Sequence, residues 1–211
     1  RQSVLRARAA IDDGSLMDEI SPIEIITRKG TSVVTHDEQP GRSDLEKLST
    51  LRPAFKADGT ITAANSSSIS DGASALLVMS ESRLNGREPL ARIAGHATHS
   101  IHPSDFTIAP VGAISKLLDQ LGWSKDSVDL FEINEAFAMV TMLAMSALSL
   151  DHERVNIYGG ACAQGHPIGS TGSRLIVTLA HAMKRRNLKR GIAALCIGGG
   201  EATAVALERQ W

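Results

Sequence analysis

The chain has 211 residues, of which 43% are hydrophobic and 21% are charged, and its formal net charge is -1. This balance is typical of a globular protein with a sizeable core, and the small net charge argues against nucleic acid as a partner. No apolar run reaches the length of a membrane span, so we expect no membrane partner. The two cysteines, Cys162 and Cys196, are too few for a disulfide framework or a zinc site. We therefore expect a cytoplasmic protein, with an organelle matrix as the alternative.

The first half of the chain predicts few regular elements. Residues 1–13 resemble the end of an amphipathic helix, and Gly14 is expected to close it. A strand is expected over residues 22–28. A short helix is expected over residues 43–51, because a Ser-Asp pair can cap it and leucines recur on one side. Residues 58–80 read as a loop of small residues that leads into an apolar segment.

From residue 90 onward, strands and helices alternate, which predicts a layered α/β domain. One helix is expected to start near Pro110 and to be closed by Gly122, with inward-facing apolar residues at helical spacing. The remaining elements of this part are a strand near residues 91–97, a strand that ends at Asn134, a helix to about Leu150, a helix to about Asn187, and strands over 191–197 and 201–208.

Three short loops stand out, because each lies where a strand ends and such junctions gather the sites of α/β proteins. The first is "NEAFA", residues 134–138. An asparagine at this position is as often a simple helix N-cap as a functional group. In the functional interpretation, the amide of Asn134 holds a water molecule or a substrate carbonyl.

The second loop is "GGACAQGHPIGSTGS", residues 159–173. Pro167 biases the backbone of His166 away from a helix, and Gly165 and Gly169 allow other groups to approach closely. A lone histidine is more often structural than catalytic, but these neighbours favour a function. Phosphate binding by the glycines is less favoured, because no Walker-type lysine follows.

The third loop follows Cys196 in "ALCIGGG", residues 194–200. A buried cysteine alone would be read as a small core residue. Three glycines directly after the thiol expose backbone N–H groups, and such donors can stabilise an oxyanion in acyl transfer.

The order "NEAFA", "GGACAQGHPIG", "CIGGG" resembles the thiolase family, the acyl-CoA C-acyltransferases, and "LRPAFKADGTITAANSSSISDGASALLVMSE" extends the resemblance backward. It covers essentially the whole chain but only the C-terminal half, or slightly more, of a family member. It implies the layered α/β/α/β/α thiolase fold. Residues 1–69 would belong to the CoA-binding loop domain, residues 70–90 would return into the N-terminal core domain, and residues 91–211 would form the C-terminal domain.

The resemblance implies roles for four residues. His166 would take the proton of a nucleophilic cysteine, and its Nε2 would pair with a water held by Asn134 to bind a thioester oxygen. Cys196 would be the general acid/base at the α-carbon, and we expect its pKa to be tuned downward by His166 and exposed N–H groups. The N–H of Gly198 would serve a second oxyanion hole. The resemblance implies no metal and no cofactor, because CoA thioesters are substrates.

The resemblance also implies contacts with coenzyme A. Ser67 matches a serine that binds the pantetheine, and Arg42 is a weaker match for a residue that binds the nucleotide phosphates. Two positions depart from the family, which often has glycine where Ala64 and Ser68 stand, and this could reshape the tunnel. The residues that would line the pantetheine tunnel are Phe55, Ala63, Ala136 and Phe137. Expected partners are acyl-CoA, CoA and, in a homodimer or homotetramer, further copies.

The family's nucleophilic cysteine would precede Arg1, so we expect the missing N-terminal half as a further partner and no activity from the chain alone. Three alternatives stay open: a non-catalytic acyl-CoA or lipid-binding relative, a β-ketoacyl synthase, and a hydrolase built on Cys162 and His166. The last lacks a visible orienting acid. In the thiolase interpretation, Cys162 is a packing residue.

Overall fold

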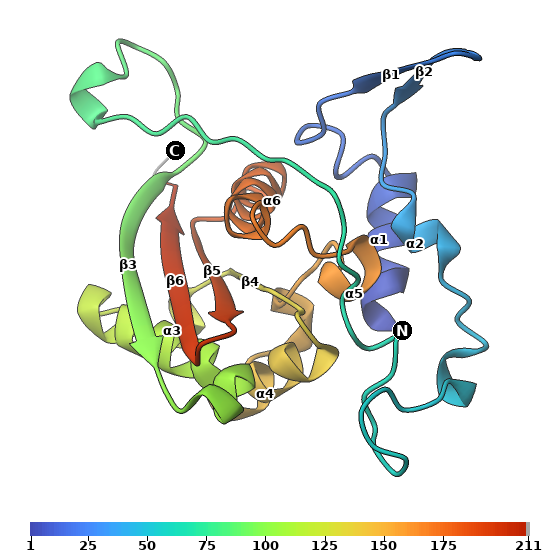
Figure 1. The fold of residues 1–211 in the computed structure, drawn as a ribbon. Helices are drawn as coiled ribbons and strands as arrows, with labels where there is room; N and C mark the ends of the chain where they lie inside the picture. Colours follow the sequence, from blue (N-terminus) through green and yellow to red (C-terminus); the bar gives the residue numbers. More distant parts are fainter. Residues whose placement is uncertain (210–211) are drawn as a thin grey trace.

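A four-stranded sheet with helices on both faces forms the centre of the chain (Figure 1), in a computed structural model that describes residues 1–209. The helices and strands are α1 (Gln2–Asp12), β1 (Ile23–Thr27), β2 (Gly30–Val34), α2 (Gln39–Arg42), β3 (Arg92–Ser100), α3 (Ala109–Leu121), β4 (Leu130–Ile133), α4 (Ala138–Leu148), α5 (Ala161–Gln164), α6 (Thr171–Arg185), β5 (Arg190–Ile197) and β6 (Glu201–Glu208). Short 3-10 turns lie at Leu48–Thr50, Glu81–Arg83, Pro103–Ile108, Lys125–Ser127 and His152–Arg154.

The strand order in the central sheet is β3-β6-β5-β4. Strand β4 pairs with β5 in parallel, with Ile133 opposite Ala194, whereas β6 is antiparallel to both of its neighbours. Parallel strands end at the same edge of a sheet. Residues that follow β4 and residues at the end of β5 are therefore neighbours, which places two of the three loops singled out in the sequence at one edge.

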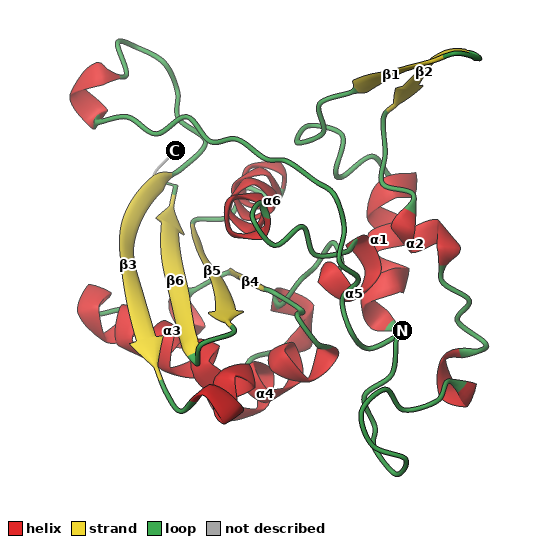
Figure 2. Cartoon of the chain, viewed as in Figure 1, coloured by secondary structure: helices red, strands yellow, loops and turns green. Residues whose placement is uncertain are grey.

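Helices cover the two faces of this sheet, as the secondary-structure view shows (Figure 2). On one face, α3 and α4 pack over alternate side chains of the strands, among them Phe131 and Ile133 of β4. On the opposite face, Leu179 and Met183 of α6 pack against the intervening side chains, among them Leu130. Successive side chains of β4 thus pack on opposite faces of the sheet, and all four of its residues are buried.

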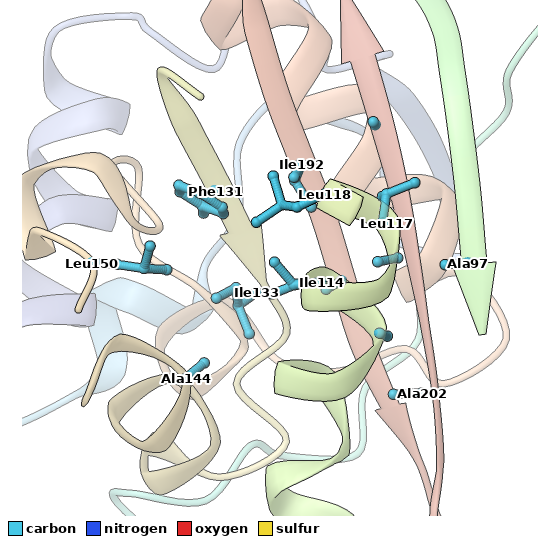
Figure 3. Close-up of a cluster of buried hydrophobic side chains, with 14 of the residues drawn as sticks. Ala97, Ile114, Leu117, Leu118, Phe131, Ile133, Ala144, Leu150, Ile192 and Ala202 are labelled. Atoms are coloured by element: carbon cyan, nitrogen blue, oxygen red, sulfur yellow. The ribbon is translucent and has the colours of Figure 1, made fainter. Parts of the chain in front are cut away.

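The larger of the two cores lies between the sheet and α3 (Figure 3). The side chains of Phe131, Ile133 and Ile192 reach from the sheet toward Ile114 and Leu117 of α3, and each of these five residues is 0% exposed. Burial of a large aliphatic or aromatic side chain contributes about 1.5–3 kcal/mol each, so this contact holds the strand ends that carry the site.

Residues before β3 are less tightly integrated. Helix α1 packs against α5 through Val4, Ala7 and Ala163, but β1 and β2 form an antiparallel hairpin whose residues are all exposed. The apolar segment before residue 80 is also exposed, with Leu77 at 85%. In Figure 1 this segment, in teal, crosses the molecule between α6 and α1 as an extended chain.

The structure confirms α1, the strand at β1, and every expected element from residue 91 onward. The helix expected over residues 43–51 is wrong, because only the turn Leu48–Thr50 forms there. Its leucines share no buried face: Leu45 packs against α1, whereas Leu51 is 39% exposed. A helix this short is marginal in water without such a face. The expectation also missed β2 and the single-turn helices α2 and α5, the last of which lies within the loop expected over residues 159–173.

Candidate functional site

Asn134 and Cys196 lie on adjacent strand ends. The backbone N–H of Asn134 donates to the carbonyl oxygen of Ala194 at 2.9 Å, so it continues the parallel pairing of β4 with β5. Cys196 stands two residues beyond Ala194, on the same face of β5, and is 8% exposed. Asn134 is 1% exposed. The sheet therefore brings these two predicted residues to one edge.

His166 reaches that edge from the loop between α5 and α6. Its ring Nε2 lies 3.3 Å from Nδ2 of Asn134, and its backbone N–H donates to the carbonyl oxygen of Ser68 at 2.8 Å. Gly165 precedes it with a φ of +86°, and a Cβ there would lie 2.2 Å from Oγ of Ser70. The close approach expected at Gly165 is therefore confirmed, whereas a Cβ at Gly169 would meet no atom within 4 Å.

The two ionisable groups of the site are both held in their neutral forms. Burial, together with the positive charge of Arg174, lowers the pKa of His166. Its ring is therefore neutral at pH 7 and can accept a proton. Burial raises the pKa of the Cys196 thiol. The downward tuning expected from the sequence is thus wrong for these 209 residues, because loss of solvation at the strand end outweighs the neighbouring N–H groups.

The turn after Cys196 is shaped by its glycines. Gly200 has a φ of +90°, and a Cβ there would lie 2.4 Å from the carbonyl oxygen of Ile101. Gly200 also accepts a hydrogen bond from the N–H of Ile101 at 2.9 Å. A Cβ at Gly198, by contrast, would meet no atom within 4 Å. The space that a side chain at Gly198 would occupy is therefore open, and the role of its N–H as a donor stays a prediction.

Five of the residues predicted to contact coenzyme A lie on the loop at 134–138 or on the segment beside it. Ser67 donates from its hydroxyl to the carbonyl oxygen of Ala136 at 2.9 Å, and its N–H donates to the same oxygen at 3.1 Å. The ring of Phe55, 72% exposed, lies edge-on to the ring of Phe137 with 6.3 Å between centroids. Ala63 is exposed on the same loop as Ser67. The segment 55–67 thus lies along the asparagine loop.

Arg42 has a different environment. It is the last residue of α2 and forms an ion pair with Glu38 of the preceding turn, with Nη2 2.8 Å from Oε1. Helix α2 is anchored to α1, since Arg8 donates to the carbonyl oxygens of Pro40 and Ser43. The role of Arg42 in phosphate binding stays a prediction.

Two residues that the sequence reasoning did not single out hold the site together. Glu135 is 7% exposed and accepts from Ser3 Oγ at 2.7 Å, from Asn156 Nδ2 at 3.1 Å and from the N–H of Cys162 at 3.1 Å. Thr171 is fully buried, and its Oγ1 lies 2.6 Å from Nδ1 of His166. In the sequence, Glu135 directly follows the asparagine, and Thr171 stands five residues after the histidine. These positions were the signals by which the two residues could have been found.

Cys162 has the surroundings of a packing residue. Its Sγ lies 3.7 Å from the carbonyl oxygen of Glu135, and burial strongly raises the pKa of its thiol. The carboxylate of Glu135 raises it further. A thiol in this environment stays protonated, which disfavours the hydrolase built on Cys162 and His166.

In this layered α/β domain, the ends of two parallel strands carry Asn134 and Cys196, and the loop histidine His166 lies against Asn134; these are the residues that the resemblance to the thiolases singled out. The comparisons with known proteins agree. Residues 2–82 match the model of the N-terminal thiolase domain and residues 87–209 match that of the C-terminal thiolase domain. The chain belongs to the thiolase family, so the alternative of a β-ketoacyl synthase is set aside.

Individual relatives are acetyl-CoA acetyltransferases and other thiolases. The chain is 47% identical over 210 residues to a probable acetyl-CoA acetyltransferase of Dictyostelium discoideum, covering 98% of this chain and 51% of the relative. The crystal structure of the Bacillus anthracis acetyl-CoA acetyltransferase superposes with a TM-score of 0.95 at 44% identity, over 98% of this chain and 53% of that one. The Acat5 thiolase of Ascaris suum in complex with coenzyme A gives 0.85 at 39% identity, over 98% and 53%. The chain thus spans about half the length of its relatives.

Within residues 1–209, no helix is long and apolar enough to cross a membrane. Over the same range, no three His, Cys, Asp or Glu side chains form a group that could hold a metal ion.

Proposed function

We propose that this chain supplies part of the active site of an acyltransferase that exchanges acyl groups between coenzyme A thioesters. In the cleavage direction, a 3-ketoacyl-CoA and free CoA give acetyl-CoA and an acyl-CoA two carbons shorter. In the condensation direction, two acetyl-CoA give acetoacetyl-CoA and free CoA. The observation that supports this best is the contact of His166 Nε2 with Asn134, at the edge where Cys196 also lies.

His166 acts first in this proposal. A cysteine thiol supplied from outside these 211 residues loses its proton to Nε2, and the resulting thiolate attacks the carbonyl carbon of the thioester or ketone. The lowered pKa of His166 leaves its ring neutral and able to accept that proton. Asn134 donates to the same nitrogen at 3.3 Å and so fixes the plane of the ring.

Cys196 acts on the α-carbon. In cleavage, the bond between the α- and β-carbons breaks, the electron pair stays on the α-carbon, and the Cys196 thiol donates its proton to that carbon. In condensation, the thiolate of Cys196 removes the α-proton of acetyl-CoA. Burial raises the pKa of the Cys196 thiol and so favours its protonated form, which is the form that cleavage requires. The N–H of Gly198 would then stabilise the oxygen of the enolate, and loss of one such donor typically costs about 10²–10³ in rate.

Coenzyme A would lie along the segment that runs beside the asparagine loop. Ser67, Ala63 and the ring of Phe55 offer one hydroxyl and two apolar surfaces for the pantetheine, next to Phe137. Arg42 would reach the nucleotide phosphates. The further partners proposed are the N-terminal half of a thiolase and additional copies in a homodimer or homotetramer. The proposed setting is fatty acid metabolism, in the cytoplasm or an organelle matrix.

The test uses the polypeptide as its gene encodes it, with any residues that precede Arg1. Cleavage of acetoacetyl-CoA by CoA is measured for the wild type and for His166→Ala, Cys196→Ala and Cys162→Ala. We expect the first two variants to lose at least about 10³-fold in kcat while CoA binding by calorimetry persists. Cys162→Ala is the matched control for removal of a thiol and should keep activity. Wild-type turnover in Cys196→Ala would refute the proposal, and CoA binding by an inactive wild type would favour the non-catalytic alternative.

A further inference from the structure

Thr171 is the first residue of α6, and its hydroxyl lies between two groups of the histidine loop. Its Oγ1 is 2.6 Å from Nδ1 of His166 and 3.0 Å from the carbonyl oxygen of Pro167. Thr171 is 0% exposed. These two contacts therefore decide together where the single proton of the hydroxyl goes.

A carbonyl oxygen can only accept a hydrogen bond, whereas a ring nitrogen of a neutral histidine can either donate or accept. The hydroxyl of Thr171 therefore donates to Pro167, and its oxygen accepts from Nδ1 of His166. That arrangement satisfies both contacts with one proton each. It places the proton of the neutral ring on Nδ1 and leaves a lone pair on Nε2.

The opposite side of the ring leads to the same result independently. The atom of Asn134 that faces Nε2 at 3.3 Å is Nδ2, which is a donor. A donor can approach Nε2 only if that nitrogen carries no proton. We infer that Thr171 is a positioning residue, which holds His166 as the Nδ1–H tautomer with the lone pair of Nε2 turned to the Asn134 edge.

The importance of this tautomer rests on the proposed function, because a base that takes a thiol proton needs the lone pair on Nε2. In the other tautomer, Nε2 would present a hydrogen to the incoming thiol and the first proton transfer could not occur. Thr171 itself touches neither substrate nor thiol in this scheme. It acts through the ring, as the residue that orients a catalytic histidine does in other acyl-transfer sites.

The tautomer can be measured without any activity. In the 211-residue chain labelled with ¹⁵N histidine, long-range ¹H–¹⁵N correlations at pH 8 report which ring nitrogen of His166 is protonated, with His166→Gln used for assignment. We expect a protonated Nδ1 in the wild type and in Thr171→Ser, and a shift toward Nε2–H in Thr171→Val. Exposed His152 serves as an internal reference for an unconstrained ring. A protonated Nε2 in the wild type, or no change in Thr171→Val, would overturn the assignment.

The second measurement uses the full-length enzyme and asks whether the tautomer matters. We expect Thr171→Val to lower kcat by about 10- to 100-fold with KM for CoA nearly unchanged, and Thr171→Ser to restore it. A hydroxyl that only stabilises the fold would change the melting temperature and leave kcat per folded molecule intact, which would contradict the positioning role. An inactive wild type with the Nδ1–H signature would instead refute the proposed function and leave the tautomer assignment standing.

Discussion

Replacement of Gly200 by alanine should destabilise the chain, whereas the same change at Gly198, two residues earlier, should not. Gly200 has a φ of +90°, and a new Cβ would lie 2.4 Å from the carbonyl oxygen of Ile101 and 3.0 Å from the backbone nitrogen of Pro103. The positive φ costs about 1–2 kcal/mol for a residue with a Cβ. Displacement of backbone rather than a flexible side chain adds about 1–3 kcal/mol.

The total for Gly200→Ala is therefore about 2–5 kcal/mol in the free energy of unfolding. At a slope of about 2 kcal/mol per molar urea, the midpoint of urea denaturation should fall by about 1–2.5 M. Trp123, which packs against the core, gives the fluorescence signal. Gly198→Ala is the matched control, since its Cβ meets no atom within 4 Å, and should stay within about 0.5 kcal/mol of the wild type. Equal midpoints for the two variants would refute the reasoning.

Three further predictions follow from burial. Phe131 is 0% exposed, so Phe131→Ala should lower the free energy of unfolding by about 3–5 kcal/mol, measured by urea denaturation. Phe55 is 72% exposed, so Phe55→Ala should lower it by less than about 0.5 kcal/mol. Similar losses in the two variants would contradict the placement of Phe131 in the core. Burial raises the pKa of Glu132 to about 8, so its contribution to stability is fully present below pH 4.5 and is lost as the pH rises through 8. The urea midpoint of the wild type should therefore fall between about pH 6 and pH 9 by more than that of Glu132→Gln, and parallel curves would argue against this. Burial also raises the pKa of both cysteine thiols, which disfavours the reactive thiolates. At pH 8, a disulfide reagent should therefore modify the folded wild type at least about tenfold more slowly than the same chain unfolded in urea, and the single variants Cys162→Ala and Cys196→Ala should show the same difference. Equal rates for the folded and unfolded chains would show that the thiols are accessible.

The second half of the fold could be predicted because its local patterns agree with its packing. The apolar residues of α3 recur at helical spacing, and those singled out by this period, such as Ile114 and Leu117, are fully buried against the sheet. The glycine-flanked loops lie at strand ends, and the two of them that carry Asn134 and Cys196 meet because β4 and β5 are parallel neighbours. In this half of the chain, the spacing of the apolar residues, their burial and the position of the site are all determined by packing around the same sheet.

Residues 17–90 could not be predicted in the same way, because many of their large apolar side chains are exposed. Ile26 is 79% exposed and Leu77 is 85% exposed, so hydrophobic period does not determine their structure. The expected helix at 43–51 failed for the same reason. The raised pKa of the Cys196 thiol was missed, because desolvation depends on the density of surrounding atoms, which no local pattern records.

The contact network of Glu135 was also beyond local reasoning, and it has a consequence for how the chain acquires its structure. The hydrogen bond from Ser3 to Glu135 joins positions 132 residues apart in the sequence. Closing so long a loop costs chain entropy and slows the search for the native pairing. The loop that carries the asparagine thus has its full set of hydrogen bonds only while α1 is docked.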